Sequence, residues 1–171
     1  MHYLGIAGRA RSGKTTLANL VKSRLEARGA TVVILPFAAP VKDIAYRMGW
    51  DGEKDEKGRR LLQLIGTECG RECSGDYVWV SAWSRALSAK TEYWREDTVV
   101  IADDVRFPNE VDIIRKRGGI VVALTRGHDP WWRRLTRHRS ERVPPGLRQF
   151  DNSGDLSALG TLADDLAHSL H

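Results

Sequence analysis

The sequence has few of the features that organise small secreted proteins or membrane proteins. It contains only two cysteines in 171 residues, Cys69 and Cys73, which excludes a network of disulfides as the basis of the fold. No apolar run approaches the roughly 18 residues that a membrane span requires, and the N-terminal residues lack the zones of a signal peptide. Internal repeats and low-complexity segments are also absent. We therefore expect a soluble, cytoplasmic protein.

The two cysteines give only weak support for a metal site. Their spacing of four residues would place them on one face of a helix, where they could supply half of a ligand set. The sequence has no second cysteine pair, and His128 and His138 lie far along the chain without matching spacing. A metal held by these thiols is therefore the less favoured interpretation.

Length and composition predict one domain with a preference for anionic partners. A chain of 171 residues with 42% hydrophobic side chains can fill one core and is too short for two ordinary domains. The formal charge of +5 and the pI near 9.5 favour polyanions, which include nucleotides and nucleic acids alike. Charge alone does not choose between these two classes.

Apolar runs that alternate with helical segments predict an α/β fold. Residues 3–7, 31–35, 98–102 and 120–124 form short apolar, mostly β-branched runs typical of buried strands, and a short final strand precedes residue 152. Helical periodicity follows residue 14, spans about 109–117 and returns after Asp155. Because helices separate the strands, the sheet should be parallel, with about five strands and helices on both faces.

Two segments interrupt this alternation within the single predicted domain. A long, mostly helical insert at about 38–96 separates the second and third strands, and a basic segment at about 126–147 follows the fourth. The core then comprises 1–37, 97–125 and 148–171. We expect the insert to determine which substrate the protein selects, and we expect the basic segment to form an arginine-rich lid over the site.

Residues 8–15 read GRARSGKT and match the pattern of a phosphate-binding loop, G-x-x-x-x-G-K-[ST]. Such a loop wraps a phosphate with backbone N–H groups, needs glycine where a side chain would block the approach, and opens a helix whose positive N-terminus faces the anion. Lys14 would bridge the β- and γ-phosphates, and Thr15 would ligate Mg²⁺. The motif predicts a three-layer P-loop NTPase fold that binds ATP and Mg²⁺. The donor-binding candidates are Gly8, Arg11, Ser12, Gly13, Lys14, Thr15 and Thr16.

Two aspartates and an arginine follow the third predicted strand. Asp103 and Asp104 come at its C-terminal end, where ligands bind in open parallel sheets. One of them should hold Mg²⁺ or polarise the acceptor, and we favour Asp104. Arg106 lies near the same sheet edge, where a guanidinium suits phosphate oxygens, although a salt bridge to Glu110 is an alternative.

The basic segment contains Arg126 and the run WWRRLTRHR at residues 131–139. Arginines on a closing lid can stabilise the charge of the transferred phosphoryl group, which makes Arg126 and Arg133 catalytic candidates. The same mixture of aromatic and basic residues could bind single-stranded nucleic acid, or the run could simply form a solvated face.

Polar residues recur at spacings of three and four within the insert. They could form a face that contacts the base and phosphate of an acceptor, or they could simply be solvated. These residues are Arg59, Arg60, Gln63, Thr67, Glu68 and Arg71.

Several strings together resemble the bacteriophage deoxynucleoside monophosphate kinases, and the resemblance runs nearly from end to end. The strings are GRARSGKTT at 8–16, FAAPVKD at 37–43, RRLLQLIGTECGRE at 59–72, DVRFPNEVDIIRKRGG at 104–119, HRSE at 138–141 and DNSGDLSAL at 151–159. The resemblance implies a P-loop kinase fold, ATP and Mg²⁺ on the donor side, and a deoxynucleoside monophosphate as acceptor. It also implies a location in the cytoplasm of an infected cell if a phage encodes the chain.

The resemblance also suggests roles for individual residues. Asn152 and Ser153 would lie where related kinases hold the donor adenine, and Arg106 would approach the acceptor phosphate. The acceptor-site candidates are Phe37, Lys42, Arg59, Gln63, Thr67, Arg71, Trp79, Arg106 and Glu110. The catalytic candidates are Lys14, Asp104, Arg106, Arg126 and Arg133, and the metal candidates are Thr15 and Asp104.

Two departures from the family pattern keep alternatives open. The family often has leucine where Val41 stands, and the lid is unusually rich in tryptophan and arginine. A basic, aromatic lid would also suit a kinase that phosphorylates 5-hydroxymethyluracil in DNA, where an alcohol attacks and an aspartate accepts its proton. A nucleotide-dependent module that binds nucleic acid without catalysis is a further alternative. A homodimer is possible as well.

Overall fold

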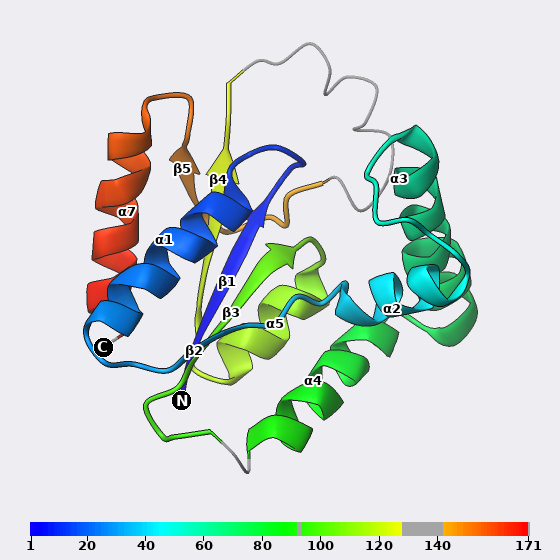
Figure 1. Cartoon of the computed structure of the whole chain (residues 1–171), viewed down its shortest axis with the longest axis horizontal. Coiled ribbons are helices and arrows are strands. Elements are labelled where there is room, and N and C mark those ends of the chain that lie inside the picture. The colour runs from blue at the N-terminus through cyan, green and yellow to red at the C-terminus, as the bar shows by residue number, and fades with distance from the viewer. Residues whose placement is uncertain (92–93, 128–141, 171) are drawn as a thin grey trace.

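A sheet of five parallel strands runs through the centre of the protein (Figure 1). The computed structural model describes residues 1–91, 94–127 and 142–170. The strands lie in the order β2-β3-β1-β4-β5. Their bounds are β1 His2–Gly8, β2 Val32–Ile34, β3 Val99–Val105, β4 Ile120–Thr125 and β5 Arg148–Asp151. Because all strands are parallel, their carboxyl ends meet at one edge of the sheet.

Helices cover both faces of this sheet and complete a three-layer arrangement. On one face, α1 (Lys14–Ala27) and α7 (Leu156–Ser169) pack against the sheet. On the other face lie α4 (Val78–Thr91) and α5 (Pro108–Lys116). The N-terminus of α7 is capped by Asp155, whose side chain accepts a hydrogen bond from the N–H of Ala158.

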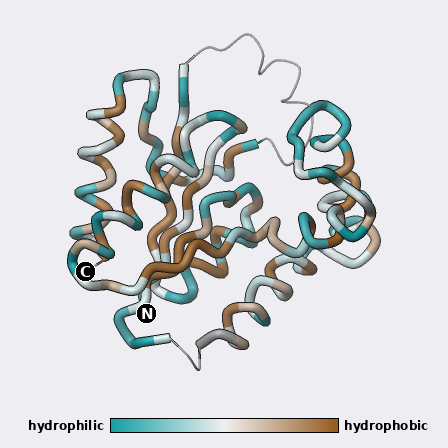
Figure 2. The backbone as a smooth tube through the Cα atoms, in the orientation of Figure 1, coloured by the Kyte–Doolittle hydropathy of each residue, from teal (hydrophilic) through white to brown (hydrophobic). Residues whose placement is uncertain are grey.

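Neighbouring strand residues divide between two hydrophobic cores. Leu4 and Ile6 of β1 belong to the core beneath α1 and α7, whereas Tyr3 and Ala7 belong to the core beneath α4 and α5. This division follows from the alternation of side chains along a strand. Figure 2 shows hydrophobic residues concentrated along the central strands. Burial on both faces explains why these strands read as continuous apolar runs in the sequence.

The insert folds into four consecutive helical segments beside the sheet. These are α2 (Ala39–Arg47), α3 (Glu56–Gln63), η1 (Leu64–Glu72) and α4. A third, smaller apolar cluster that includes Val41, Ala45, Ile65 and Trp79 holds them together. The sequence predicts ordinary helix through residues 59–72, but η1 is a π-helix. Such widened turns are rare and occur frequently at functional sites.

The predicted fold is confirmed, because the structure contains the expected parallel sheet with helices on both faces. The third strand differs from expectation, since β3 extends to Val105 and so includes Asp103 and Asp104. Most of the predicted lid lies outside the described residues. Within the described part of the chain, no helix is both long enough and apolar enough to cross a membrane.

Candidate functional site

The loop between β1 and α1 has the conformation that a phosphate-binding loop requires. Gly8 and Gly13 have φ angles of 146° and 97°, which side-chain-bearing residues rarely adopt. A Cβ at Gly8 would lie 2.6 Å from the carbonyl oxygen of Leu124, so glycine is also needed for close packing. The side chain of Lys14 folds over the loop, and its Nζ donates to the carbonyl oxygen of Arg9 at 2.6 Å.

The loop leads directly into the N-terminus of α1. Gly13 is the residue that precedes the helix, and no acidic residue occupies the first turn. Ser12 is buried within the loop, whereas Thr15 and Thr16 are exposed in the first turn. Backbone N–H groups and the positive end of the helix dipole therefore face the same region as Lys14. This arrangement suits the phosphates of a nucleotide.

The two aspartates at the end of β3 face different partners. Thr15 donates its hydroxyl hydrogen bond to Oδ2 of Asp103 at 2.9 Å. The two carboxylate oxygens of Asp104 instead accept the backbone N–H groups of Phe37 and Ala38, each at 2.8 Å. The expected metal carboxylate, Asp104, therefore makes its hydrogen bonds to backbone amides and not to Thr15. Asp103 lies beside the Thr15 hydroxyl, and Asp104 ties β3 to the segment that begins α2.

The carboxylate of Asp104 is buried, which disfavours its charged form. Burial raises the pKa of Asp104, and the neighbouring Asp103 carboxylate raises it further. The N–H groups of Ala38 and Phe37 and the charge of Arg106 act in the opposite direction. The site therefore contains two adjacent carboxylates with different surroundings, one engaged with Thr15 and one engaged with backbone amides.

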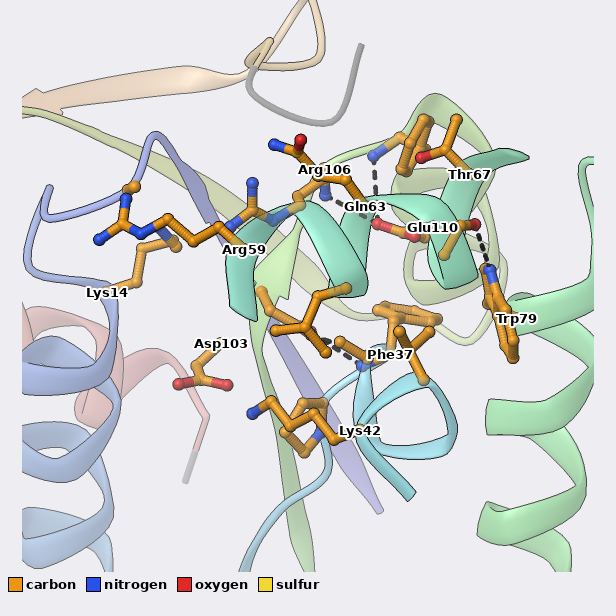
Figure 3. Close-up of a pocket in the computed structure, with 18 of the residues that line it drawn as sticks. Lys14, Phe37, Lys42, Arg59, Gln63, Thr67, Trp79, Asp103, Arg106 and Glu110 are labelled. Carbon is orange, nitrogen blue, oxygen red and sulfur yellow. Dashed lines mark hydrogen bonds between the residues drawn. The ribbon is translucent and has the colours of Figure 1, made fainter. Parts of the chain in front are cut away.

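A cavity of about 400 Å³ extends from the phosphate loop to the insert (Figure 3). Its lining includes Lys14, Thr15 and Asp103 at one end and Trp79 and Glu110 at the other. All nine acceptor-site candidates from the sequence line it, although they are spread between residues 37 and 110 of the chain. They are Phe37, Lys42, Arg59, Gln63, Thr67, Arg71, Trp79, Arg106 and Glu110.

Arg71 and Glu110 are buried against each other rather than turned toward a ligand. The Nη2 of Arg71 donates to Oε1 of Glu110 at 2.5 Å, and their side chains are 1% and 4% exposed. The Oε2 of Glu110 accepts the backbone N–H groups of Arg106 at 2.7 Å and Phe107 at 3.1 Å. Burial and the charge of Asp104 raise the pKa of Glu110 to about 7.

This pair bears on the salt bridge to Glu110 that was an alternative for Arg106. The acidic partner that the sequence analysis considered for Arg106 is paired with Arg71, and Arg106 reaches Glu110 through its backbone N–H. The guanidinium of Arg71 also lies 3.7 Å from the ring centre of Phe107 and donates to the carbonyl oxygen of Asp76. Arg71 therefore fastens η1 to the start of α5 and forms part of the end wall of the cavity.

The aromatic candidates Trp79 and Phe37 also form walls that are held in place. The indole N–H of Trp79 donates to the carbonyl oxygen of Gly66 at 2.6 Å. The ring of Phe37 stacks on Trp83 with a centroid separation of 4.9 Å. Since the N–H of Trp79 is already used, this residue can offer a ligand only its ring surface.

Of the candidates that follow β4, Asn152 contacts the phosphate loop. Asn152 donates from Nδ2 to the carbonyl oxygen of Ser12 at 3.0 Å. The hydroxyl of Ser153 accepts the N–H of Gly127 and donates to Asp151, both at 2.5 Å. Arg126 is exposed just after β4. Arg133, the remaining lid candidate, lies outside the described residues.

Sequence reasoning missed several residues that line the cavity. Lys54 lies in the loop between α2 and α3, and its carbonyl oxygen accepts from Nε of Arg59 at 2.7 Å. The only available signal was its position in a charged loop. The other lining residues that were not proposed for the site are small or apolar, and most lie within the strings of the family resemblance: Ala10, Pro36, Ala38, Val41, Leu62, Gly66 and Phe107.

Curated relatives agree with the resemblance found in the sequence. The chain is 25% identical over 150 residues to a protein of Acanthamoeba polyphaga mimivirus that is provisionally named deoxynucleotide monophosphate kinase. That match covers 74% of this chain and 75% of the mimivirus protein. A second match is 33% identical over 58 residues to the deoxynucleoside-5′-monophosphate kinase of Escherichia phage T5. It covers 34% of this chain and only 21% of the phage protein. No family model matches the chain.

Solved structures show the same fold at low sequence identity. The APS kinase of Mycobacterium tuberculosis, as an alanine variant, superimposes with a TM-score of 0.52 and 12% identity, covering 98% of this chain and 96% of that chain. A provisionally named kinase from Chloroflexus aurantiacus gives a TM-score of 0.54 at 13% identity, with coverage of 99% and 97%. The relatives and these neighbours are all named kinases, in agreement with the predicted phosphotransferase. The chain is thus similar in sequence to viral proteins named deoxynucleoside or deoxynucleotide monophosphate kinase, and it shares its fold with solved kinases.

Proposed function

We propose that the protein is a deoxynucleoside monophosphate kinase. It would transfer the γ-phosphoryl group of ATP to the 5′-phosphate of a deoxynucleoside monophosphate and release the diphosphate and ADP. The names of the two viral relatives support this assignment. The strongest support from the structure is the state of the carboxylates in the cavity.

Each of the three carboxylates that line the cavity already accepts a hydrogen bond. Asp103 accepts from Thr15, Asp104 from two backbone amides, and Glu110 from Arg71 and two backbone amides. An alcohol acceptor needs a group that takes its proton as it attacks. A phosphate monoester attacks with an oxygen that is already ionised, so it needs no strong base. A phosphate acceptor would therefore need none of these engaged carboxylates as a base, whereas a hydroxyl acceptor would need one.

The balance of charge in the cavity points in the same direction. Seven lysine and arginine residues line it against three carboxylates, which favours an anionic occupant. The cationic residues are Arg11, Lys14, Lys42, Lys54, Arg59, Arg71 and Arg106. Arg59 is anchored through Nε to the carbonyl oxygen of Lys54, which leaves the outer edge of its guanidinium to contact phosphate. Figure 3 shows Arg59 between Lys14 and Gln63.

The donor end of the cavity fits ATP and Mg²⁺ by the chemistry of its groups. The backbone amides of the glycine-containing loop and Lys14 would hold the β- and γ-phosphates. The Thr15 hydroxyl and the Asp103 carboxylate are neighbouring hard oxygen ligands, which Mg²⁺ prefers. Bound Mg²⁺ would supply positive charge to the phosphates. In this proposal Asp103 replaces Asp104 as the carboxylate on the metal side.

The residues of the chain would act mainly by positioning and by stabilising charge. An oxygen of the acceptor phosphate forms a bond to the γ-phosphorus while the bond to the bridging oxygen breaks, and that electron pair leaves with ADP. Lys14 would follow the charge toward the leaving oxygen. Arg59 and Arg106 would hold the acceptor phosphate in line, because fixed guanidinium groups restrict its orientation.

Product analysis tests this proposal directly. The full chain is incubated with labelled ATP, Mg²⁺ and, separately, each deoxynucleoside monophosphate and a strand of DNA containing 5-hydroxymethyluracil. We expect labelled diphosphate from at least one monophosphate. Label on the DNA alone would refute the monophosphate acceptor and favour the DNA kinase. ATP binding without any labelled product would instead favour the non-catalytic module.

Two adjacent arginines provide a matched test of the acceptor end. Arg59 lines the cavity, whereas Arg60 has an exposed side chain that pairs with Glu68 at 2.8 Å. Arg59→Ala should raise the KM for the monophosphate by roughly tenfold or more, because a charge-assisted contact to phosphate is lost. Arg60→Ala should leave this KM within roughly twofold, since exposed ion pairs contribute little. Equal effects of the two changes would contradict the placement of the acceptor phosphate.

A further inference from the structure

The polar side chains that line the cavity differ in whether the protein already satisfies them. Most of the neutral or acidic ones have partners, as described above for Thr15, Asp103, Asp104, Glu110 and the indole of Trp79. Two neutral polar residues of the lining, Gln63 and Thr67, have side chains that make no hydrogen bond with any described residue. Their free hydrogen-bonding capacity faces the cavity rather than the protein.

Thr67 is the more informative of the two because it is almost completely enclosed. The residue is 5% exposed, so most of its surface is packed against the protein. A threonine within a helix can donate its hydroxyl to the carbonyl oxygen three or four residues earlier. Thr161 in α7 does this with Ser157 at 3.3 Å, but Thr67 in η1 does not. The hydroxyl of Thr67 is not among the enclosed polar atoms without a partner, so it opens onto the cavity that the residue lines, where a ligand can supply its hydrogen bond.

Gln63 and Thr67 lie on the same wall of the cavity. They are four residues apart across the junction of α3 and η1, and residues at this spacing share a helical face. Figure 3 shows both side chains on this wall, with Phe37 on the other side of the cavity. Phe37, Val41 and Leu62 supply apolar lining nearby. Such a combination of flat apolar surface and a few polar groups is typical of a site for a nucleobase.

The charged groups at this end of the cavity are poorly suited to reading a base. The guanidinium of Arg71 and the carboxylate of Glu110 are bound to each other and to neighbouring backbone groups. The amide of Gln63 and the hydroxyl of Thr67 can each donate and accept hydrogen bonds. Because the amide can rotate by half a turn, it can match an edge that presents a donor beside an acceptor in either order.

On the basis of the function proposed above, we propose that Gln63 and Thr67 are the residues that read the base of the acceptor nucleotide. The cationic groups near Lys14 and Arg59 would hold its phosphate, and the base would lie between the Gln63 wall and the Phe37 side. Hydrogen bonds from Gln63 and Thr67 would set the relative preference among bases. Recognition would then depend on neutral groups rather than on a charged pair.

Gln63→Glu tests this assignment by removing the donor while keeping the shape. A carboxylate only accepts hydrogen bonds, so it suits guanine, whose N1 and N2 present two adjacent donors. It suits thymine poorly, because thymine has one N–H between two carbonyl oxygens. The ratio of kcat/KM for dGMP to that for dTMP should therefore rise by roughly tenfold or more in Gln63→Glu. Gln149, an exposed residue in β5, provides the matched control, and Gln149→Glu should leave the ratio unchanged.

Thr67 is tested by a pair of changes that keep its size. Thr67→Val removes the hydroxyl and should lower kcat/KM for the preferred monophosphate by roughly tenfold, with the KM for ATP unchanged. Thr67→Ser retains the hydroxyl and should preserve most of the activity. This pair also guards against misfolding, because Thr67→Val is nearly isosteric and breaks no hydrogen bond to a described residue, so it should leave thermal stability close to that of wild type.

The four monophosphates are assayed with wild type and all variants, so two kinds of failure are distinguishable. If wild type forms no diphosphate from any of them, the proposed function falls and the base-reading assignment falls with it. If wild type is active but Gln63→Glu and Thr67→Val retain the wild-type pattern of preference and efficiency, the function stands and the assignment is overturned.

Discussion

Replacing each of the adjacent aspartates Asp103 and Asp104 with asparagine should produce two different defects. The Oδ2 of Asp103 accepts from the hydroxyl of Thr15 at 2.9 Å, an exposed contact beside the phosphate loop. Both oxygens of Asp104 accept backbone N–H groups at 2.8 Å, and these bonds fix the start of the insert. Asp103→Asn should therefore impair the metal site, and Asp104→Asn should impair the acceptor site and the fold.

The size of the second defect follows from the hydrogen bonds. An asparagine at 104 has one acceptor oxygen, so its NH₂ group must face one of the two backbone donors. One charge-assisted bond is lost and one partly buried N–H is left without an acceptor, at a cost of about 2–4 kcal/mol in the free energy of unfolding. Asp103→Asn loses a single exposed contact, and its free energy of unfolding should change by less than about 1 kcal/mol.

Urea unfolding and titrations of activity with Mg²⁺ separate the two variants. We expect Asp103→Asn to require several-fold more Mg²⁺ for half-maximal activity while its stability is close to that of wild type. Asp104→Asn should unfold at lower urea and show a raised KM for the monophosphate with an unchanged Mg²⁺ requirement. The reverse pattern, with the Mg²⁺ defect in Asp104→Asn alone, would refute the assignment of these carboxylates.

Two further predictions concern the packing of η1. Arg71→Met leaves Glu110 buried without its guanidinium and should lower the free energy of unfolding by about 3–5 kcal/mol at pH 8. Glu110 already has a pKa raised from 4.5 to about 7, and losing Arg71 raises it further, so its folded form retains a proton that the unfolded form releases. The free energy of unfolding of the variant therefore falls as the pH rises above the unfolded-state pKa of 4.5. Urea unfolding should show that Arg71→Met loses less free energy of unfolding, relative to wild type, at pH 5.5 than at pH 8. Equal losses at the two pH values would contradict this explanation. Gly70→Ala places a Cβ against the ring of Trp79 and 2.8 Å from the carbonyl oxygen of Ile65, and thermal unfolding should show a loss of about 1–3 kcal/mol. Gly66→Ala, whose Cβ meets Val41 at 3.7 Å, is the control and should be nearly neutral.

Sequence reasoning predicted most reliably where the signal is local. The phosphate loop needs glycine at two positions of positive φ and a lysine and threonine next to them, and all of these lie within eight residues. The buried strands are apolar on both sides, so their runs are visible without knowledge of their neighbours. The helical spacing of three and four residues also brought Arg59, Gln63 and Thr67 to one wall.

The contacts that differ from the expectations join distant segments of the chain. Whether Asp103 or Asp104 faces Thr15 is decided by how far β3 extends, because adjacent strand residues point in opposite directions. The partner of Glu110 is Arg71, which lies 39 residues away, so no short-range spacing identifies it. The π-helical turns of η1 are stabilised by tertiary contacts such as that between Trp79 and Gly66, and helix propensity does not reveal them.

The π-helical segment η1 also limits how the chain can change in length. A π-helix accommodates more residues per turn than an α-helix, so deleting a residue between Leu64 and Glu72 would favour the tighter form. Each residue removed rotates everything beyond it by about 100° around the helix axis. Thr67 and Arg71 could then no longer meet the cavity and Glu110 together. We therefore expect relatives with this site to tolerate substitutions in the segment more readily than insertions or deletions.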